Sequence, residues 1–209
     1  MLKTSSLTFQ YTKDDPIFSF PDISLENQEN LLVIGKSGIG KTTFLHLFAG
    51  LLQPVNGTIL ISDIDINTLS HSKLDAFRGV HIGLVFQKKY AIQNLNVFQN
   101  LQARLLFSKK RINHKEIDVL LAQLGLLDFK KSKINKLSEG QLQRLGIALA
   151  VIHKPKVILA DEPTSSLDDE NCKIVMDLLL EQASKIGANL IIITHDQRVK
   201  PFFKKTVLL

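Results

Sequence analysis

Short apolar runs and helical periodicities alternate along the 209 residues of the chain. Apolar runs bounded by Pro or Gly predict strands at residues 7–11, 17–20, 31–34, 58–61, 83–86, 157–160 and 190–194. Apolar spacings of three and four residues predict helices after residue 41, in two segments of 97–127, and at 139–153 and 169–185. This alternation predicts a single α/β domain over residues 1–209.

Two regions stand apart from this alternation. The first third is mostly short strands, which predicts a β layer against which a nucleotide base can lie. Residues 97–127 have helical spacing throughout, which predicts a helical subdomain of roughly residues 88–145 inserted in the domain.

One glycine-rich segment lies between an apolar run and a helical pattern. Its residues fit the pattern G-x-x-x-x-G-K-[ST] and are Gly35, Lys36, Ser37, Gly38, Ile39, Gly40, Lys41 and Thr42, followed by Thr43. Glycines let backbone N–H groups curl round an anion, and the following helix directs its positive end at it. Lys41 adds a point charge and Thr42 offers a hydroxyl to Mg²⁺. The segment therefore predicts a phosphate-binding loop for a nucleoside triphosphate.

Two carboxylates end a second apolar strand pattern, residues 157–160. Asp161 and Glu162 then lie at the carboxyl end of a strand, where α/β sheets bind ligands. In phosphoryl transfer one such acid holds Mg²⁺ and its neighbour polarises the attacking water. We assign Asp161 to the metal and Glu162 to the water.

Composition adds few constraints. The net charge of +6 would attract nucleic acid, anionic lipid or nucleotide alike, and does not select a partner. The apolar runs are too short to cross a bilayer, so any membrane role must come through a partner. Cys172 is the only cysteine, which excludes an intrachain disulfide and indicates an inert thiol in a cytoplasmic protein.

A pentapeptide at the start of the third predicted helix makes the interpretation specific. It consists of Leu137, Ser138, Glu139, Gly140 and Gln141, and it resembles the signature of ABC ATPases except at Glu139, where glycine is usual. The spacing of Ser138 and Gln141 also predicts a capping box. The resemblance covers nearly the whole chain and is greatest to the ATPases of lipoprotein-release and macrolide-efflux systems.

The family resemblance implies a fold and further site residues. The fold would be a P-loop NTPase of ABC ATPase type, with a mostly parallel central sheet, an N-terminal antiparallel β layer and an inserted helical subdomain. Tyr11 matches the residue that stacks on adenine, Gln87 the glutamine that contacts Mg²⁺, and His195 the histidine that contacts the γ-phosphate. The loop that crosses the dimer matches Ser166, Leu167 and Asp168.

The resemblance also implies a mechanism and partners. Two subunits, identical or similar, would enclose ATP and Mg²⁺ between the phosphate loop of one and the signature of the other. Closure would drive membrane-spanning subunits docked near residues 87–98, with the chain held peripherally on the inner face of the cell membrane and no nucleic-acid partner. The alternative is an ABC-type ATPase that acts as a clamp or scaffold on a soluble or cell-division assembly. A nucleotide kinase is disfavoured, because it would leave the pentapeptide unexplained.

Overall fold

The computed structural model describes residues 1–86, 91–165 and 167–209. Its centre is a sheet of five parallel strands in the order β10, β4, β9, β8, β7. These strands are Thr206–Leu208 (β10), Asn30–Ile34 (β4), Asn189–Thr194 (β9), Val157–Asp161 (β8) and Ile82–Val85 (β7). The sheet confirms the predicted parallel centre.

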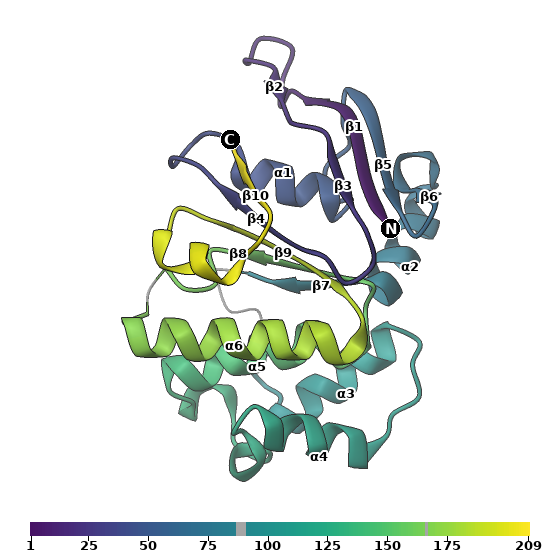
Figure 1. The fold of residues 1–209 in the computed structure, drawn as a ribbon. Coiled ribbons are helices and arrows are strands. Elements are labelled where there is room, and N and C mark those ends of the chain that lie inside the picture. Colours follow the sequence, from purple (N-terminus) through teal and green to yellow (C-terminus); the bar gives the residue numbers. More distant parts are fainter. Residues whose placement is uncertain (87–90, 166) are drawn as a thin grey trace.

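A second, antiparallel sheet is formed by the N-terminal residues. Strand β1 pairs with β2, β3 and β5, and β5 also pairs with β6. The strands are Leu2–Phe9 (β1), Phe18–Ser19 (β2), Ile23–Leu25 (β3), Asn56–Ile61 (β5) and Ile64–Asp65 (β6). This sheet is the predicted N-terminal β layer, and it lies with α1 on one side of the parallel sheet (Figure 1).

The other helices lie mainly on the opposite face of the parallel sheet, where α5 and α6 run side by side with α3 and α4 beyond them (Figure 1). The six helices in the described ranges are Lys41–Phe48 (α1), His71–His81 (α2), Val97–Phe107 (α3), His114–Gln123 (α4), Glu139–Val151 (α5) and Asp169–Ile186 (α6). Short 3-10 turns occupy Ile66–Thr68, Leu127–Phe129, Ile134–Lys136 and Gln197–Phe202. None of the described helices combines the length and the apolar character needed to span a bilayer.

The hydrophobic core has two parts, because successive residues of the parallel strands face opposite sides of the sheet. On β4, Leu32 and Ile34 join the cluster formed with α3 to α6. Their neighbours Leu31 and Val33 join the cluster formed with α1 and the antiparallel sheet. Burial on both faces explains why these strands are apolar throughout.

Strand β7 approaches helix α5 more closely than a side chain would allow. A Cβ atom built on Gly83 would collide with the backbone carbonyl of Ala150 in α5. Glycine at position 83 is therefore required for the backbone of helix α5 to lie directly against the sheet.

Several sequence predictions of elements were incomplete. Helix α2 and strands β3, β6 and β10 were not predicted, and β1 ends at Phe9 rather than at Tyr11. The three missed strands are short, and α2 is mostly polar, with only Leu74 and Phe77 buried. The single-domain assignment and the bounds 88–145 of the helical subdomain remain predictions.

Candidate functional site

The phosphate-binding loop joins the end of β4 to the start of α1. Gly40 has a φ of 103° at the N-cap of α1, in the left-handed region that favours glycine. A Cβ on Gly40 would also lie 2.8 Å from Cδ1 of Phe18. The buried Lys41 donates from Nζ to the backbone oxygens of Gly35 (2.9 Å) and Lys36 (3.0 Å), so its ammonium is held against the loop. The helix start leaves backbone N–H groups for an anion.

Asp161 is the last residue of β8 and faces the same loop. Its Oδ2 accepts a hydrogen bond of 3.2 Å from the hydroxyl of Thr42. Burial raises the pKa of the Asp161 carboxyl, while the bond from Thr42 opposes that shift. The two residues bring together a carboxylate and a hydroxyl, both hard oxygen ligands of the kind that Mg²⁺ uses.

Glu162 follows directly and has a φ of 48°, in the left-handed region. That conformation is costly for a residue with a side chain, by about 1–3 kcal/mol. The carboxylate accepts hydrogen bonds from the hydroxyl of Thr194 (2.6 Å) and the backbone N–H of His195 (3.1 Å). Nζ of Lys41 lies 3.8 Å from Oε1 of Glu162. The strained backbone therefore turns the carboxylate toward the phosphate loop, and Thr194, His195 and Lys41 hold it there.

Tyr11 stands at the side of a cleft of about 390 Å³. Its hydroxyl lies 2.7 Å from Oγ1 of Thr43, and its ring packs edge-on against Phe9 with centroids 4.7 Å apart. The residue is 57% exposed, so Tyr11 is not part of the strand core. The same cleft is lined by residues of β2, the phosphate loop, the start of α1 and the turns after β8 and β9, namely Phe18, Ser37, Gly38, Gly40, Lys41, Thr42, Thr43, Glu162 and His195.

The pentapeptide lies at the start of α5. Ser138 is the N-cap, and both bonds of the predicted capping box with Gln141 are present. Leu137 is buried, whereas Ser138 and Glu139 are exposed. A Cβ on Gly140 would meet nothing within 4 Å, so the surface above it is open. This helix start is not among the residues that line the cleft around Lys41.

Sequence reasoning missed a link between the pentapeptide helix and the acidic strand. The buried side chain of Gln143 donates from Nε2 to the backbone oxygen of Pro163 at 2.9 Å. Pro163 directly follows Glu162, so the bond ties α5 to the turn that carries the proposed base. The signal in the sequence was Gln143 itself, a polar residue at a position of α5 that faces the core.

A second missed residue, Arg198, holds the turn after β8 against the turn after β9. It donates to the carboxylate of Asp196 (2.9 and 2.8 Å), and this pairing is the main reason that the pKa of Asp196 falls to about 2. It also donates to the backbone oxygens of Leu167 (3.1 Å) and Thr164 (3.4 Å). The segment with Leu167 is thereby fixed next to the loop of His195.

Two site predictions lie outside the described residues, namely Gln87 and Ser166. Asp168 has a local role in the structure as the N-cap of α6, where its Oδ1 accepts from the backbone N–H of Asn171 at 2.8 Å. That bond is the main reason that the pKa of Asp168 is lowered.

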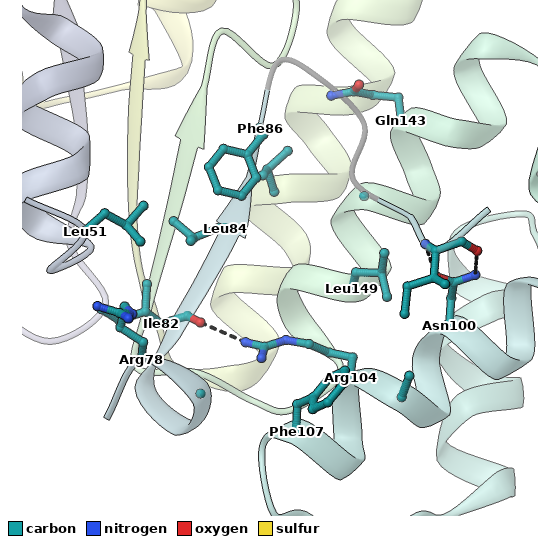
Figure 2. Close-up of a pocket in the computed structure, with 15 residues that line it drawn as sticks. Leu51, Arg78, Ile82, Leu84, Phe86, Asn100, Arg104, Phe107, Gln143 and Leu149 are labelled. Atoms are coloured by element: carbon teal, nitrogen blue, oxygen red, sulfur yellow. Dashed lines mark hydrogen bonds between the residues drawn. The ribbon is translucent and has the colours of Figure 1, made fainter. Parts of the chain in front are cut away.

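A groove of about 330 Å³ lies away from the cleft, between the parallel sheet and α3 (Figure 2). Leu51, Leu84 and Phe107 supply apolar wall, and Arg104 crosses it with a 3.0 Å hydrogen bond from Nη2 to the backbone oxygen of Ile82. Of the apolar residues near the predicted docking stretch, Ile92 lines the groove, whereas Val97 is fully buried core.

A phosphate loop at the start of α1, faced by two carboxylates at the end of β8, defines a P-loop nucleoside triphosphatase. The chain belongs to the ABC transporter family, because the sequence model of that family matches residues 20–165. It is 36% identical over 203 residues to the lipoprotein-releasing system ATP-binding protein LolD of Buchnera aphidicola subsp. Schizaphis graminum, covering 95% of this chain and 87% of that protein. LolD of Legionella pneumophila (strain Lens) is 33% identical, with coverage of 90% and 84%.

Solved structures agree with this membership. The ATP-binding cassette MJ0796, in a dimeric post-hydrolysis state bound to ADP and Pi, superimposes with a TM-score of 0.88 at 30% identity, covering 100% of this chain and 94% of that one. The structure of cbiO1 from Clostridium perfringens, part of the ABC transporter complex cbiONQ, gives a TM-score of 0.88 at 28% identity, with coverage of 99% and 83%. The chain is therefore an ATP-binding, ATP-hydrolysing subunit of an ABC transporter.

Proposed function

We propose that the cleft between the phosphate loop and β8 is the ATPase centre, with Glu162 as the base that activates water. The observation that carries this assignment is the convergence of Lys41, Asp161 and Glu162 on one loop. Lys41 and the start of α1 bind the phosphates, and Tyr11 supports the adenine ring. His195 contacts Glu162 and would also contact the terminal phosphate of a bound ATP. Together these residues bind the nucleotide, orient it and accept a proton from water.

We infer that Mg²⁺ accompanies ATP at this centre. Thr42 and Asp161 fit such an ion, because their oxygens lie within 3.2 Å of each other at the foot of the loop. Gln87, outside the described residues, completes the proposed ligand set. When bound, the ion would neutralise phosphate charge and favour the ionised form of Asp161, which burial disfavours.

We propose that a complete site needs a second subunit, identical or similar. Residues 137–141 of one subunit then contact the ATP held by the other, and Ser166, Leu167 and Asp168 lie at the dimer contact. The start of α5 supports this role, because Ser138 and Glu139 are exposed, the surface above Gly140 is open, and a helix N-terminus attracts anions. The dimeric cassette structure of MJ0796 is a precedent in a relative.

The groove beside α3 is the proposed docking site for membrane-spanning subunits, which would hold the chain peripherally on the inner face of the cell membrane. Its apolar wall suits a helix from such a subunit, and Arg78 and Arg104 offer charges at its polar side (Figure 2). By similarity to proteins named as lipoprotein-releasing, the transported class is proposed to be lipoproteins.

The variant Lys41→Ala tests the ATPase centre. It removes the ammonium from the loop and is expected to abolish measurable binding of ATP, followed by equilibrium dialysis, while the fold is retained. Exposed Lys36 contributes only a backbone oxygen to Lys41, so Lys36→Ala is a matched loop control. Wild-type ATP affinity in folded Lys41→Ala would refute the assignment.

Purification from detergent-solubilised membranes tests the transport role separately. A stoichiometric membrane protein that is lost on Leu84→Asp in the groove supports docking there. A stoichiometric soluble partner instead would favour the clamp or scaffold alternative.

A further inference from the structure

The end of α3 exposes two large apolar side chains next to each other. Leu106 is 66% exposed and Phe107 is 70% exposed, and Ile112 beyond the helix is 37% exposed. Removing apolar surface from water is favourable, so a partner that covers these side chains would gain affinity from them. We name these three residues together with Lys109, Lys110 and Arg111 the α3–α4 patch.

Three consecutive cations lie between these apolar residues. Lys109, Lys110 and Arg111 are all exposed. Lys110 and Arg111 also line a hollow of about 700 Å³ together with His114 and Lys154. Among the residues that line it, the only acid is Glu116, which pairs with Lys154 at 3.5 Å. The hollow therefore keeps an excess of positive charge suited to a phosphate group.

The backbone holds this patch in a defined shape. The hydroxyl of Ser108 donates to the backbone oxygen of Arg104 (2.8 Å), and the N–H of Lys110 donates to that of Leu105 (3.0 Å). Lys109 has a φ of 53°, at a helix end where glycine is favoured. A cation near a helix C-terminus stabilises the helix, but this does not account for the exposed Phe107 beside it. Apolar side chains and cations side by side are the composition of a surface that binds anionic membranes.

We propose that the α3–α4 patch binds the surface of an anionic phospholipid bilayer, with Leu106 and Phe107 entering the headgroup region and the basic residues on lipid phosphates. The bilayer and the proposed membrane subunits would then contact the same side of the chain, because Phe107 also lines the groove assigned above to these subunits (Figure 2). This part of the inference rests on the proposed function, whereas lipid binding by the patch does not.

Vesicle sedimentation of the isolated chain, without membrane subunits, tests the inference. The chain is expected to sediment with vesicles that contain phosphatidylglycerol and not with pure phosphatidylcholine. The triple variant Lys109→Gln, Lys110→Gln, Arg111→Gln is expected to weaken binding about fivefold per lost cation, roughly a hundredfold together. The matched control removes three exposed cations elsewhere, Lys173, Lys200 and Lys204, and should bind nearly as the wild type does. ATP binding reports that each variant is folded.

Tryptophan fluorescence gives a second, local measurement, since the chain contains no tryptophan. The emission of Phe107→Trp should shift to the blue with phosphatidylglycerol vesicles and remain unchanged with phosphatidylcholine. Ile174→Trp, at a 43% exposed site on α6, is the control and should show no shift.

Three results would overturn the inference. They are equal binding to both kinds of vesicle, an equal loss in the triple variant and its control, and no blue shift of Phe107→Trp. A different result would make the patch a contact with a protein instead. In that case the wild type does not sediment with phosphatidylglycerol vesicles, and the triple variant no longer co-purifies with membrane subunits from detergent. Failure of the docking experiment with intact vesicle binding would refute the proposed groove alone.

Discussion

Nδ1 of the His195 imidazole lies 2.8 Å from Oε1 of the Glu162 carboxylate. The resemblance to ABC ATPases assigned His195 to the γ-phosphate, and in the structure its described partner is the proposed base. The backbone N–H of His195 also donates to Glu162 at 3.1 Å. The loop after β9 thus fixes the carboxylate that is proposed to activate water, so the orientation of Glu162 would matter as much as its charge.

Glu162→Gln should bind ATP but hydrolyse it between about 10² and 10⁴ times more slowly, because the amide keeps the shape and loses the base. The hydroxyl of Thr194 can still donate to the amide oxygen, so the fold should be retained. Phosphate release measures hydrolysis, and gel filtration with ATP and Mg²⁺ should show a trapped dimer. A monomer alone under these conditions would contradict the two-subunit site.

Tyr11→Ala should weaken the binding of ATP and ADP alike by roughly 1–3 kcal/mol if the ring stacks on adenine. Tyr11→Phe keeps the ring, removes the hydrogen bond to Thr43 and is expected to bind nearly normally. Isothermal titration with both nucleotides measures the effect. Equal loss in both variants would mean that the hydroxyl, through Thr43, matters more than the ring.

Glu139→Gly in the Glu162→Gln background should tighten the ATP-dependent dimer. Two like unit charges at about 7 Å repel by roughly 2 kcal/mol at an effective dielectric near 20, so a carboxylate approaching the opposite γ-phosphate opposes closure. The effect should be largest at low salt. The dimer dissociation constant, from light scattering at two ionic strengths, measures it. A weaker dimer would indicate that Glu139 pairs with a cation across the interface.

His153→Gln should reduce the dependence of stability on pH. Burial first, and the charge of Arg104 second, lower the pKa of His153 to about 3. Between its unfolded pKa near 6.5 and that value only the unfolded chain takes up the proton, so stability falls as the pH falls, by about 1.4 kcal/mol per pH unit. Urea unfolding at pH 7 and pH 5 should therefore show a smaller loss in the variant. The substitution of exposed His71 by Gln is the control, and an unchanged slope in His153→Gln would contradict the prediction.

Local patterns predicted the parts of the site that are contiguous in sequence. The phosphate loop and the acids after β8 depend on short motifs between strongly apolar elements, so Lys41, Asp161 and their elements followed directly. The links made by Gln143 and Arg198 were missed because the backbone oxygens that they bind, those of Pro163 and Thr164, lie 20 and 34 residues away and have no sequence signature. Short strands such as β3 and β10 were not predicted, because pairing with β1 and β4 stabilises them and their own residues form no distinct apolar pattern.

The direct contact of β7 with α5 has a consequence for the interpretation of natural variants. Even the smallest substitution, Gly83→Ala, would force the backbone at Ala150 away and displace helix α5, which Ser138 caps. Every residue of the phosphate loop, the acidic strand and the pentapeptide would still be present. A screen of natural variants that only checks whether these motifs are intact would therefore classify Gly83→Ala as functional. In that variant the pentapeptide would nevertheless be out of position.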